Sequence, residues 1–392
     1  MRVLLATTSN AGHFGPMLPF GAACRRAGHE VLVAAPESFA AAVDRAGYPY
    51  WPCADIDPDE RAAVHARFLA AEPENRNAVM VTLFADLAVR SIMPGMLSAI
   101  DEWRPDVLLR EFSEFGSSIA AELRQVPQVQ VLIGLDKFVD FTIPLAAPAV
   151  AKFRESLGLA PDDAGDRLHR LPSLSLLPLS LEAPRSTVGP QVFRYRDPAA
   201  GGSGTALPSW WEGVDTPLVY ATFGTVATAV PFALAAFHTV IDSLAELPVR
   251  LLATIGDNGD PSDWSALPRN VHVERWLPQQ DVFPHAAAMV CHGGTGTVLG
   301  ALAAGVPLVV VPQFADHPDN AERVAAIGAG LRVGVDGTTT PVDPAEIRAA
   351  VTRVLSEPSF RLAANRIAEE IRALPPADDA VGLLEKIAQP SM

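Results

Sequence analysis

Short runs rich in valine and leucine alternate with alanine-rich amphipathic stretches along the chain. In the first half the apolar runs are Arg2–Ala6, Glu30–Ala34, Asp106–Leu109 and Val129–Ile133. The pattern restarts in the second half with Leu218–Thr222, Arg250–Thr254, Ala288–Cys291 and Pro307–Val311. Apolar strands that alternate with helices are typical of parallel sheets with helices on both faces. The sequence therefore predicts an α/β protein with two similar halves.

A segment rich in glycine and proline separates the two halves. Residues Arg194–Pro208 contain Asp-Pro-Ala-Ala-Gly-Gly-Ser-Gly, a composition typical of linkers. We therefore predict an N-terminal domain over residues 1–200 and a C-terminal domain over residues 215–375. Residues 376–392 are expected to form a helix that packs back on the N-terminal domain. The polar, proline-punctuated segment Asp55–Asn77 is predicted to be a mobile loop that grips a ligand.

Charge and cysteine content exclude several classes of function. The net charge of −15 repels nucleic acid and anionic membranes, so any phosphate must be bound by a local device. No apolar run approaches the roughly 20 residues that a membrane helix needs, so no membrane span is predicted. Cys24, Cys53 and Cys291 have neither metal-ligand spacing nor a disulfide pattern, which favours a reducing cytoplasm and no bound metal.

A glycine-rich turn offers such a local device for phosphate. His292-Gly-Gly-Thr-Gly-Thr297 lies between the predicted strand Ala288–Cys291 and a predicted helix over Val298–Ala304. Backbone N–H groups and the positive end of the helix dipole bind anions there without any lysine. Two other interpretations are a tightly packed strand–helix corner and a dinucleotide site that uses Asp316. Asp316 follows Pro312 and so lies beyond the strand end where a ribose ligand belongs.

The whole stretch from Trp276 to Asn320 resembles the donor-binding signature of family 1 glycosyltransferases. The matching elements are W-x-P-Q, then H, H-G-G-x-G-T, P-x-x-x-D and N-A, in that order. This family includes plant natural-product enzymes and bacterial antibiotic-tailoring enzymes. The resemblance implies the GT-B fold, in which two Rossmann-like, doubly wound domains face a central cleft. It also implies transfer of a sugar from a nucleotide diphosphate donor.

The resemblance further implies roles for individual residues. Trp276 would stack on the nucleobase, Gln279 would hold the base or ribose, and Asp316 would bind sugar hydroxyls. Tyr220-Ala-Thr-Phe-Gly-Thr225 looks like the family's S-F-G-T loop, which contacts the diphosphate. The donor-binding residues expected on these grounds are Gly12, Gly224, Thr225, Trp276, Gln279, His292, Gly293, Gly294, Thr295, Gly296, Thr297, Asp316 and His317.

Two positions depart from the plant pattern. Gly300 stands where plant enzymes carry a glutamate that binds the ribose, which favours TDP, whose deoxyribose lacks the 2′-hydroxyl, over UDP. His317 stands where those enzymes usually carry glutamine, so the sequence does not determine which sugar hydroxyls are bound there.

The N-terminal half carries a candidate catalytic base. Its first strand is followed by Gly12-His13-Phe-Gly-Pro16, and this G-H-x-x-P context resembles the segment that holds the family's general base. Histidine titrates near neutral pH and is suited to removing a proton from an attacking hydroxyl. A carboxylate normally orients such a histidine. Glu111 occupies the matching place after the strand near residue 110, and Glu114 is the alternative.

The predicted function is metal-independent, inverting transfer of a sugar from TDP or UDP to a hydrophobic secondary metabolite. The acceptor would contact the N-terminal domain, where Phe68, Leu69, Phe84 and Phe138 are either wall or core residues. The resemblance leaves a homodimer open. Rival hypotheses are a nucleotide-sugar epimerase of the same fold, a nicotinamide-dependent oxidoreductase and a non-catalytic helper of another glycosyltransferase.

Overall fold

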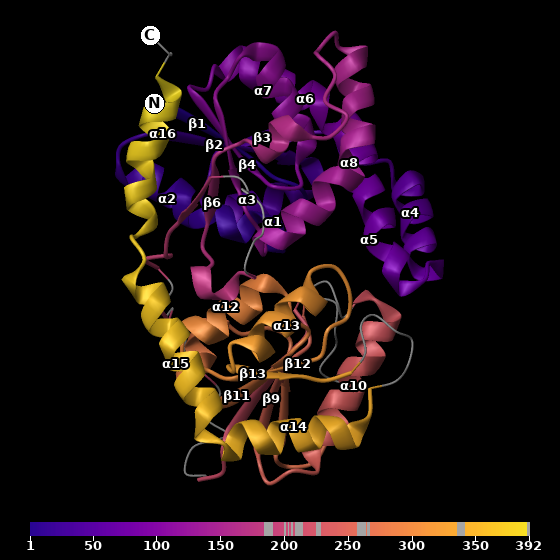
Figure 1. The fold of residues 1–392 in the computed structure, drawn as a ribbon, viewed down its shortest axis with the longest axis vertical. Helices are drawn as coiled ribbons and strands as arrows, with labels where there is room; N and C mark the ends of the chain where they lie inside the picture. The colour runs from indigo at the N-terminus through magenta and orange to yellow at the C-terminus, as the bar shows by residue number, and fades with distance from the viewer. Residues whose placement is uncertain are drawn as a thin grey trace. The chain divides into compact units, whose positions relative to one another are not determined.

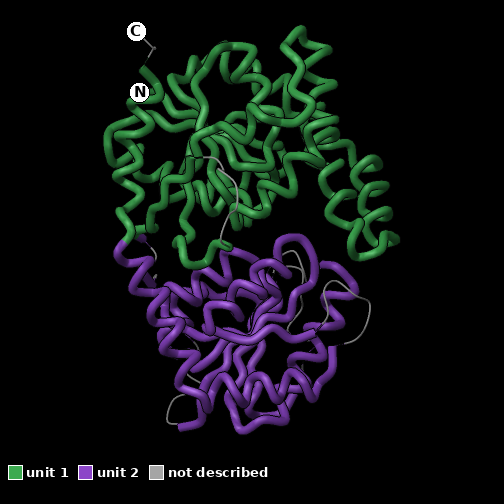
Figure 2. The backbone as a smooth tube through the Cα atoms, viewed as in Figure 1, with its two compact units in different colours: residues 1–198, 374–392 green, residues 199–373 purple. Residues whose placement is uncertain are grey.

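The computed structural model describes residues 1–183, 191–199, 201–202, 204, 207, 215–224, 229–256, 264, 267–334 and 342–389. The chain forms two compact units, residues 1–198 together with 374–392, and residues 199–373 (Figure 2). Each unit contains one parallel sheet with helices packed against it (Figure 1). The predicted α/β class is therefore confirmed.

The first unit contains a seven-stranded parallel sheet in the order β3-β2-β1-β4-β5-β6-β7. Its strands are β1 (Arg2–Ala6), β2 (Glu30–Pro36), β3 (Tyr50–Cys53), β4 (Val107–Glu111), β5 (Gln128–Val131), β6 (Ser173–Ser175) and β7 (Val192–Arg194). Its longer helices are α2 (Leu18–Arg26), α3 (Ala40–Arg45), α4 (Pro58–Ala70), α5 (Pro73–Thr82), α6 (Val89–Trp103), α7 (Phe115–Arg124), α8 (Asp136–Ser156) and α16 (Ala380–Ala388). The short helices are α1 (Ala11–Phe14) and α9 (Asp166–His169).

Side chains of β1 supply both cores of the first unit. Val3 and Leu5 face one side, where α2 and α16 pack, whereas Leu4 and Ala6 face the other, where α6, α7 and α8 pack. Because both faces are buried, the strands are apolar without a polar alternation. The C-terminal helix α16 lies beside α2 in this unit (Figure 1).

The second unit contains a six-stranded parallel sheet in the order β10-β9-β8-β11-β12-β13. Its strands are β8 (Leu218–Thr222), β9 (Arg250–Thr254), β10 (Val271–Glu274), β11 (Ala286–Cys291), β12 (Leu308–Val310) and β13 (Gly330–Arg332). Its helices are α10 (Pro231–Ala245), α11 (Gln279–Val282), α12 (Thr295–Ala303), α13 (His317–Ala326), α14 (Pro344–Ser356) and α15 (Pro358–Ala373). α10 packs against α14, and α12 packs against α15.

The strand order of both sheets reverses at one point. In the first unit the reversal lies between β1 and β4, and in the second between β8 and β11. Loops that leave neighbouring strands in opposite directions at such a point open a crevice at the carboxyl edge of the sheet. The candidate site residues are therefore expected in the loops that follow β1 and β4 in the first unit and β8 and β11 in the second.

The predicted loop over Asp55–Asn77 is wrong, because this segment is mostly helical. Helix α4 occupies Pro58–Ala70, and α5 begins at Pro73. The side chain of Asp57 caps α4 by accepting the N–H groups of Asp59 and Glu60. Each proline stands in the first helical turn, where its missing N–H costs nothing, so the prolines mark helix starts.

One long helical segment is more apolar than the sequence pattern indicates. Among the described residues, Pro73–Trp103 has the length and mean hydropathy (1.4 in an 18-residue window) of a helix that could cross a membrane. Ile92, Met96 and Ile100 of this segment are nevertheless buried in the core of the first unit. The search for long apolar runs in the sequence did not find this segment, because Asp86 and Arg90 divide it into shorter apolar runs.

Candidate active site

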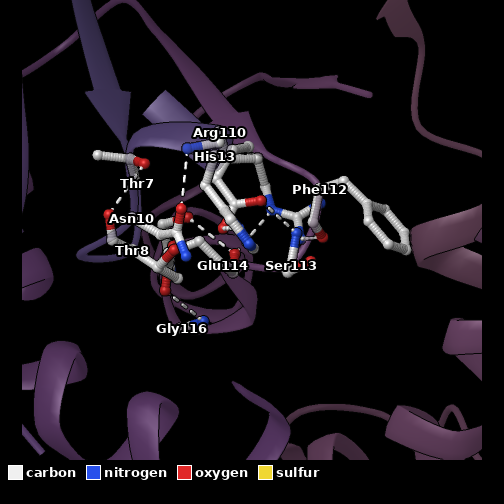
Figure 3. Close-up of polar contacts among 12 residues, drawn as sticks. Thr7, Thr8, Asn10, His13, Arg110, Phe112, Ser113, Glu114 and Gly116 are labelled. Carbon is white, nitrogen blue, oxygen red and sulfur yellow. Dashed lines mark hydrogen bonds and ion pairs between the residues drawn. The ribbon is translucent and has the colours of Figure 1, made fainter. Parts of the chain in front are cut away.

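The loop after β1 and the end of β4 bring His13 and Glu111 together. The side chain of Asn10 caps α1 by accepting the N–H of Gly12 at 2.8 Å, which fixes the short helix that carries His13. Nδ1 of His13, which is labelled in Figure 3, lies 3.0 Å from Oε1 of Glu111. Glu111 is fully buried, whereas 14% of the His13 side chain is exposed. Because an ionised carboxylate only accepts, Nδ1–H donates, and the lone pair of neutral His13 is on Nε2.

Glu111 is held from its other side as well. The backbone N–H of Ser113 donates to Oε2 of Glu111 at 2.7 Å. Glu114 has a different role, since it caps α7 by accepting the N–H groups of Gly116 and Ser117 at 2.9 and 2.8 Å. Of the two carboxylates that the sequence left open, Glu111 is thus the one that contacts His13.

Phe84 covers one face of the His13 ring. The two ring centroids lie 5.4 Å apart with an interplanar angle of 26°. Phe84 belongs to a π-helical turn, Leu83–Ala88, between α5 and α6. π-Helical turns are rare and change the direction of the side chains that they carry. Of the other predicted wall residues, Phe68 is buried, Phe138 packs against the core and Leu69 is partly exposed.

The glycine-rich turn of the second unit follows β11 and leads into α12. This helix begins at Thr295, earlier than predicted, so Thr295, Gly296 and Thr297 form its first turn. The N–H groups of Thr295 and Gly296 therefore have no acceptor within the helix. Gly293 adopts φ 99°, and a Cβ there would lie 2.9 Å from Val310 Cγ1 and 3.0 Å from the His317 carbonyl oxygen. Only glycine fits this position without strain.

A hydrogen-bond network joins the turn to the start of α13. The hydroxyl of Thr295 donates to Oδ2 of Asp316 at 2.5 Å. The amide of Asn320 lies 2.9 Å from the same oxygen and 2.8 Å from the carbonyl of Gly293. Asn320 belongs to the N-A element but is not among the predicted site residues. The sequence places it near Asp316 without indicating that its amide reaches back to the turn.

Two neutral histidines lie beneath this turn. The ring of His292 is close to two glycines. A Cβ would lie 3.1 Å from the ring at Gly224 and 2.5 Å from it at Gly294. Burial, with a smaller effect of His317, lowers the pKa of His292 to about 3. Burial also lowers the pKa of His317 to about 3, and the N–H of Phe314 donates to its Nδ1. Both rings are therefore uncharged near neutral pH.

The lowered pKa values predict a loss of stability in acid. The unfolded chain binds protons on these histidines below about pH 6.5, whereas the folded chain binds them only near pH 3. The free energy of unfolding should therefore decrease as pH falls from about 6.5 towards 3. We expect His317→Gln to flatten this decrease, measured as the urea midpoint at each pH. The exposed His285→Gln is the control, and equal slopes in all three proteins would contradict the prediction.

The remaining predicted donor residues lie in several loops. Trp276 follows β10 and is 58% exposed, so its ring is available to a ligand. Gln279 begins α11 and lies against the buried hydroxyl of Tyr220. Gly300 packs on Phe283, since a Cβ there would lie 3.0 Å from Cε2 of that ring. Thr225 lies outside the described residues.

Comparisons with known proteins show the family to which the chain belongs. The family described as "Erythromycin biosynthesis protein CIII-like" matches through its N-terminal domain over residues 22–187 and its C-terminal domain over residues 238–387. The chain belongs to this family. It is 32% identical to the L-demethylnoviosyl transferase of Streptomyces niveus, over 98% of this chain and 97% of that protein.

Solved structures agree with the fold. The glycosyltransferase SsfS6 of Streptomyces sp. SF2575, complexed with thymidine diphosphate, matches with a TM-score of 0.76 and 26% identity. The match covers 98% of this chain and 99% of that one. Glycosyltransferase VinC in complex with DTDP has the same fold, with a TM-score of 0.79 and 24% identity over 99% of each chain. The predicted GT-B fold and the natural-product glycosyltransferase class are thereby confirmed, which disfavours the epimerase and oxidoreductase hypotheses.

Proposed function

We propose that this glycosyltransferase moves a deoxysugar from a TDP donor to a hydrophobic natural product, with inversion and with His13 as general base. The observation that carries this proposal is the contact between His13 Nδ1 and the buried Glu111 carboxylate at the reversal point of the first sheet. The description of the family, "Erythromycin biosynthesis protein CIII-like", supports a natural product as the acceptor.

The chemistry follows from the tautomer of His13. Nε2 accepts the proton of an acceptor hydroxyl as the oxygen attacks the anomeric carbon, and Glu111 stabilises the imidazolium that forms. Attack from the face opposite the leaving diphosphate inverts the anomeric centre. The N-terminal turn of α12 would stabilise the leaving diphosphate through its N–H groups and dipole. This stabilisation does not depend on a metal ion.

Two observations support TDP as the donor nucleotide. A side chain at position 300 would crowd the ring of Phe283, because a Cβ there would lie 3.0 Å from Cε2 of that ring. A carboxylate for a ribose 2′-hydroxyl is therefore disfavoured at this position. SsfS6, a relative at 26% identity, is complexed with thymidine diphosphate.

Calorimetric titration with TDP, UDP and NADP, in the presence of EDTA, tests the donor site. TDP is expected to bind most tightly, and Trp276→Ala to weaken it by about 1–3 kcal/mol through lost stacking. Trp264→Ala is the control, since this tryptophan stacks on His238 of α10 and is not among the predicted donor residues. Binding of NADP alone, or a requirement for a divalent cation, would contradict the proposal.

A further inference from the structure

Near the end of β4 lies a fully buried arginine, Arg110, directly before Glu111. Its guanidinium donates to the carbonyls of Phe112 and Glu114 at 2.6 and 2.9 Å, and to the side-chain oxygen of Gln130 at 3.0 Å. Arg110 thus holds both ends of the loop that presents the Ser113 N–H to Glu111. A buried charge normally needs an opposite charge nearby. The described hydrogen bonds of Arg110 go to neutral oxygens, so its counter-charge must be a neighbour that it does not touch directly.

Glu114 is the neighbouring buried carboxylate that remains after Glu111 is assigned to His13. Both of its oxygens accept backbone N–H groups at the start of α7, an arrangement that favours the ionised form. Burial raises the pKa of Glu114, whereas the hydrogen bonds of Ser117 and the charge of Arg110 lower it. Burial lowers the pKa of Arg110, and Glu114 and then Glu111 raise it.

We propose that Arg110 and Glu114 balance each other's charge beneath the active site, so that the negative charge of Glu111 acts on His13 alone. In this arrangement Arg110 and Glu114 are positioning residues. One arginine and two glutamates give the cluster a net charge of −1, which becomes zero when His13 takes a proton. The proposal rests on the proposed role of His13 as general base.

The neighbouring strands present uncharged groups to the cluster. Thr7 and Thr8, which directly follow β1, contribute buried hydroxyls (Figure 3). β5 contributes the amide of Gln130. β3 presents Cys53, whose thiol pKa is raised to about 12 by burial and then by Glu114, so the thiol is neutral. In this proposal, the charges that set the proton affinity of His13 are those of Arg110, Glu111 and Glu114.

The titration of His13 measures this balance without any acceptor. The full chain, labelled with 13C at histidine, is titrated by NMR, and the His13 signal is assigned by its loss in His13→Gln. Glu114→Gln removes a negative charge and should lower the pKa of His13 by about one unit. Arg110→Gln removes a positive charge and should raise it by about as much. The double variant should return it close to the wild-type value, and Arg110→Lys should also stay close to it.

Glu122→Gln is the matched control. Glu122 is on the same helix α7, two turns after Glu114, and forms an ion pair with Arg154. Its replacement should leave the titration of His13 unchanged. If Arg110→Gln does not fold, Glu114→Gln alone decides, because an unchanged His13 pKa in that variant overturns the proposal. Loss of transfer in His13→Gln tests the general base separately, so the two proposals fail by different results.

Discussion

Replacing His13 with glutamine is expected to lower kcat/KM for sugar transfer by about 10²- to 10⁴-fold. Glutamine keeps a similar size and polarity but cannot take a proton from the acceptor hydroxyl near neutral pH. His13 and one predicted donor residue, Gly12, lie in the first unit, whereas the other predicted donor residues, such as Trp276, lie in the second. The substitution at position 13 leaves Gly12 in place. The Kd for TDP, measured by calorimetry, should therefore stay unchanged in this variant.

Glu111→Gln should lower the rate as well, because the carboxylate fixes the tautomer of His13 and stabilises its protonated form. The control is His65→Gln, which makes the same substitution at an exposed position on α4. Full activity of His13→Gln, or loss of TDP affinity together with activity, would remove the case for a general base.

Replacing Gly293 with alanine is expected to weaken donor binding strongly and to destabilise the second unit. The alanine Cβ would have to enter a space bounded by Val310 and by the backbone oxygen of His317, at φ 99°. Strain at this backbone angle and overpacking each cost about 1–3 kcal/mol. The turn would shift to relieve the clash, and Asn320 would lose the carbonyl that it holds at 2.8 Å. TDP affinity should fall by about 100-fold or more, on the basis of 1.4 kcal/mol per tenfold.

Gly382→Ala is the control for this change. This glycine lies in α16, and a Cβ at this position would meet no described atom within 4 Å beyond its own helix backbone. Alanine there should leave TDP affinity unchanged and raise stability by about 0.5–1 kcal/mol. Wild-type TDP affinity in Gly293→Ala would show that the turn does not hold the diphosphate.

The predicted strands were found because buried parallel strands leave a simple sequence pattern. Leu218–Thr222 and Arg250–Thr254 were predicted with the bounds that the structure gives them. The helix α4 was missed because its polar surface hides the few residues, Val64 and Phe68, that it buries. Prolines in such a segment indicate either a loop or a helix start, and the local sequence does not separate the two.

How far a candidate site residue could be predicted depends on whether the topology or the local course of the backbone determines its position. His13 lies in the segment that joins β1 to the first helices, and the topology of an α/β sheet puts such segments at the carboxyl edge of the sheet. Glu111 and Glu114 are both near the end of one strand, and only the course of the following loop separates their roles. Phe84 reaches His13 through a π-helical turn, and no periodicity in the sequence indicates such a change of direction.

The return of the chain to the first unit has a consequence for making chimaeras of such enzymes. Arg196 pairs with Pro376, Arg26 bonds Asp378, and the helix α16 lies beside α2. A recombinant exchange of donor specificity with a relative therefore needs two junctions, one near Pro198 and one near Leu374. A hybrid with a single crossover near Pro198 would take residues 1–198 from one parent and residues 374–392 from the other. The three contacts would then form between sequences from different proteins.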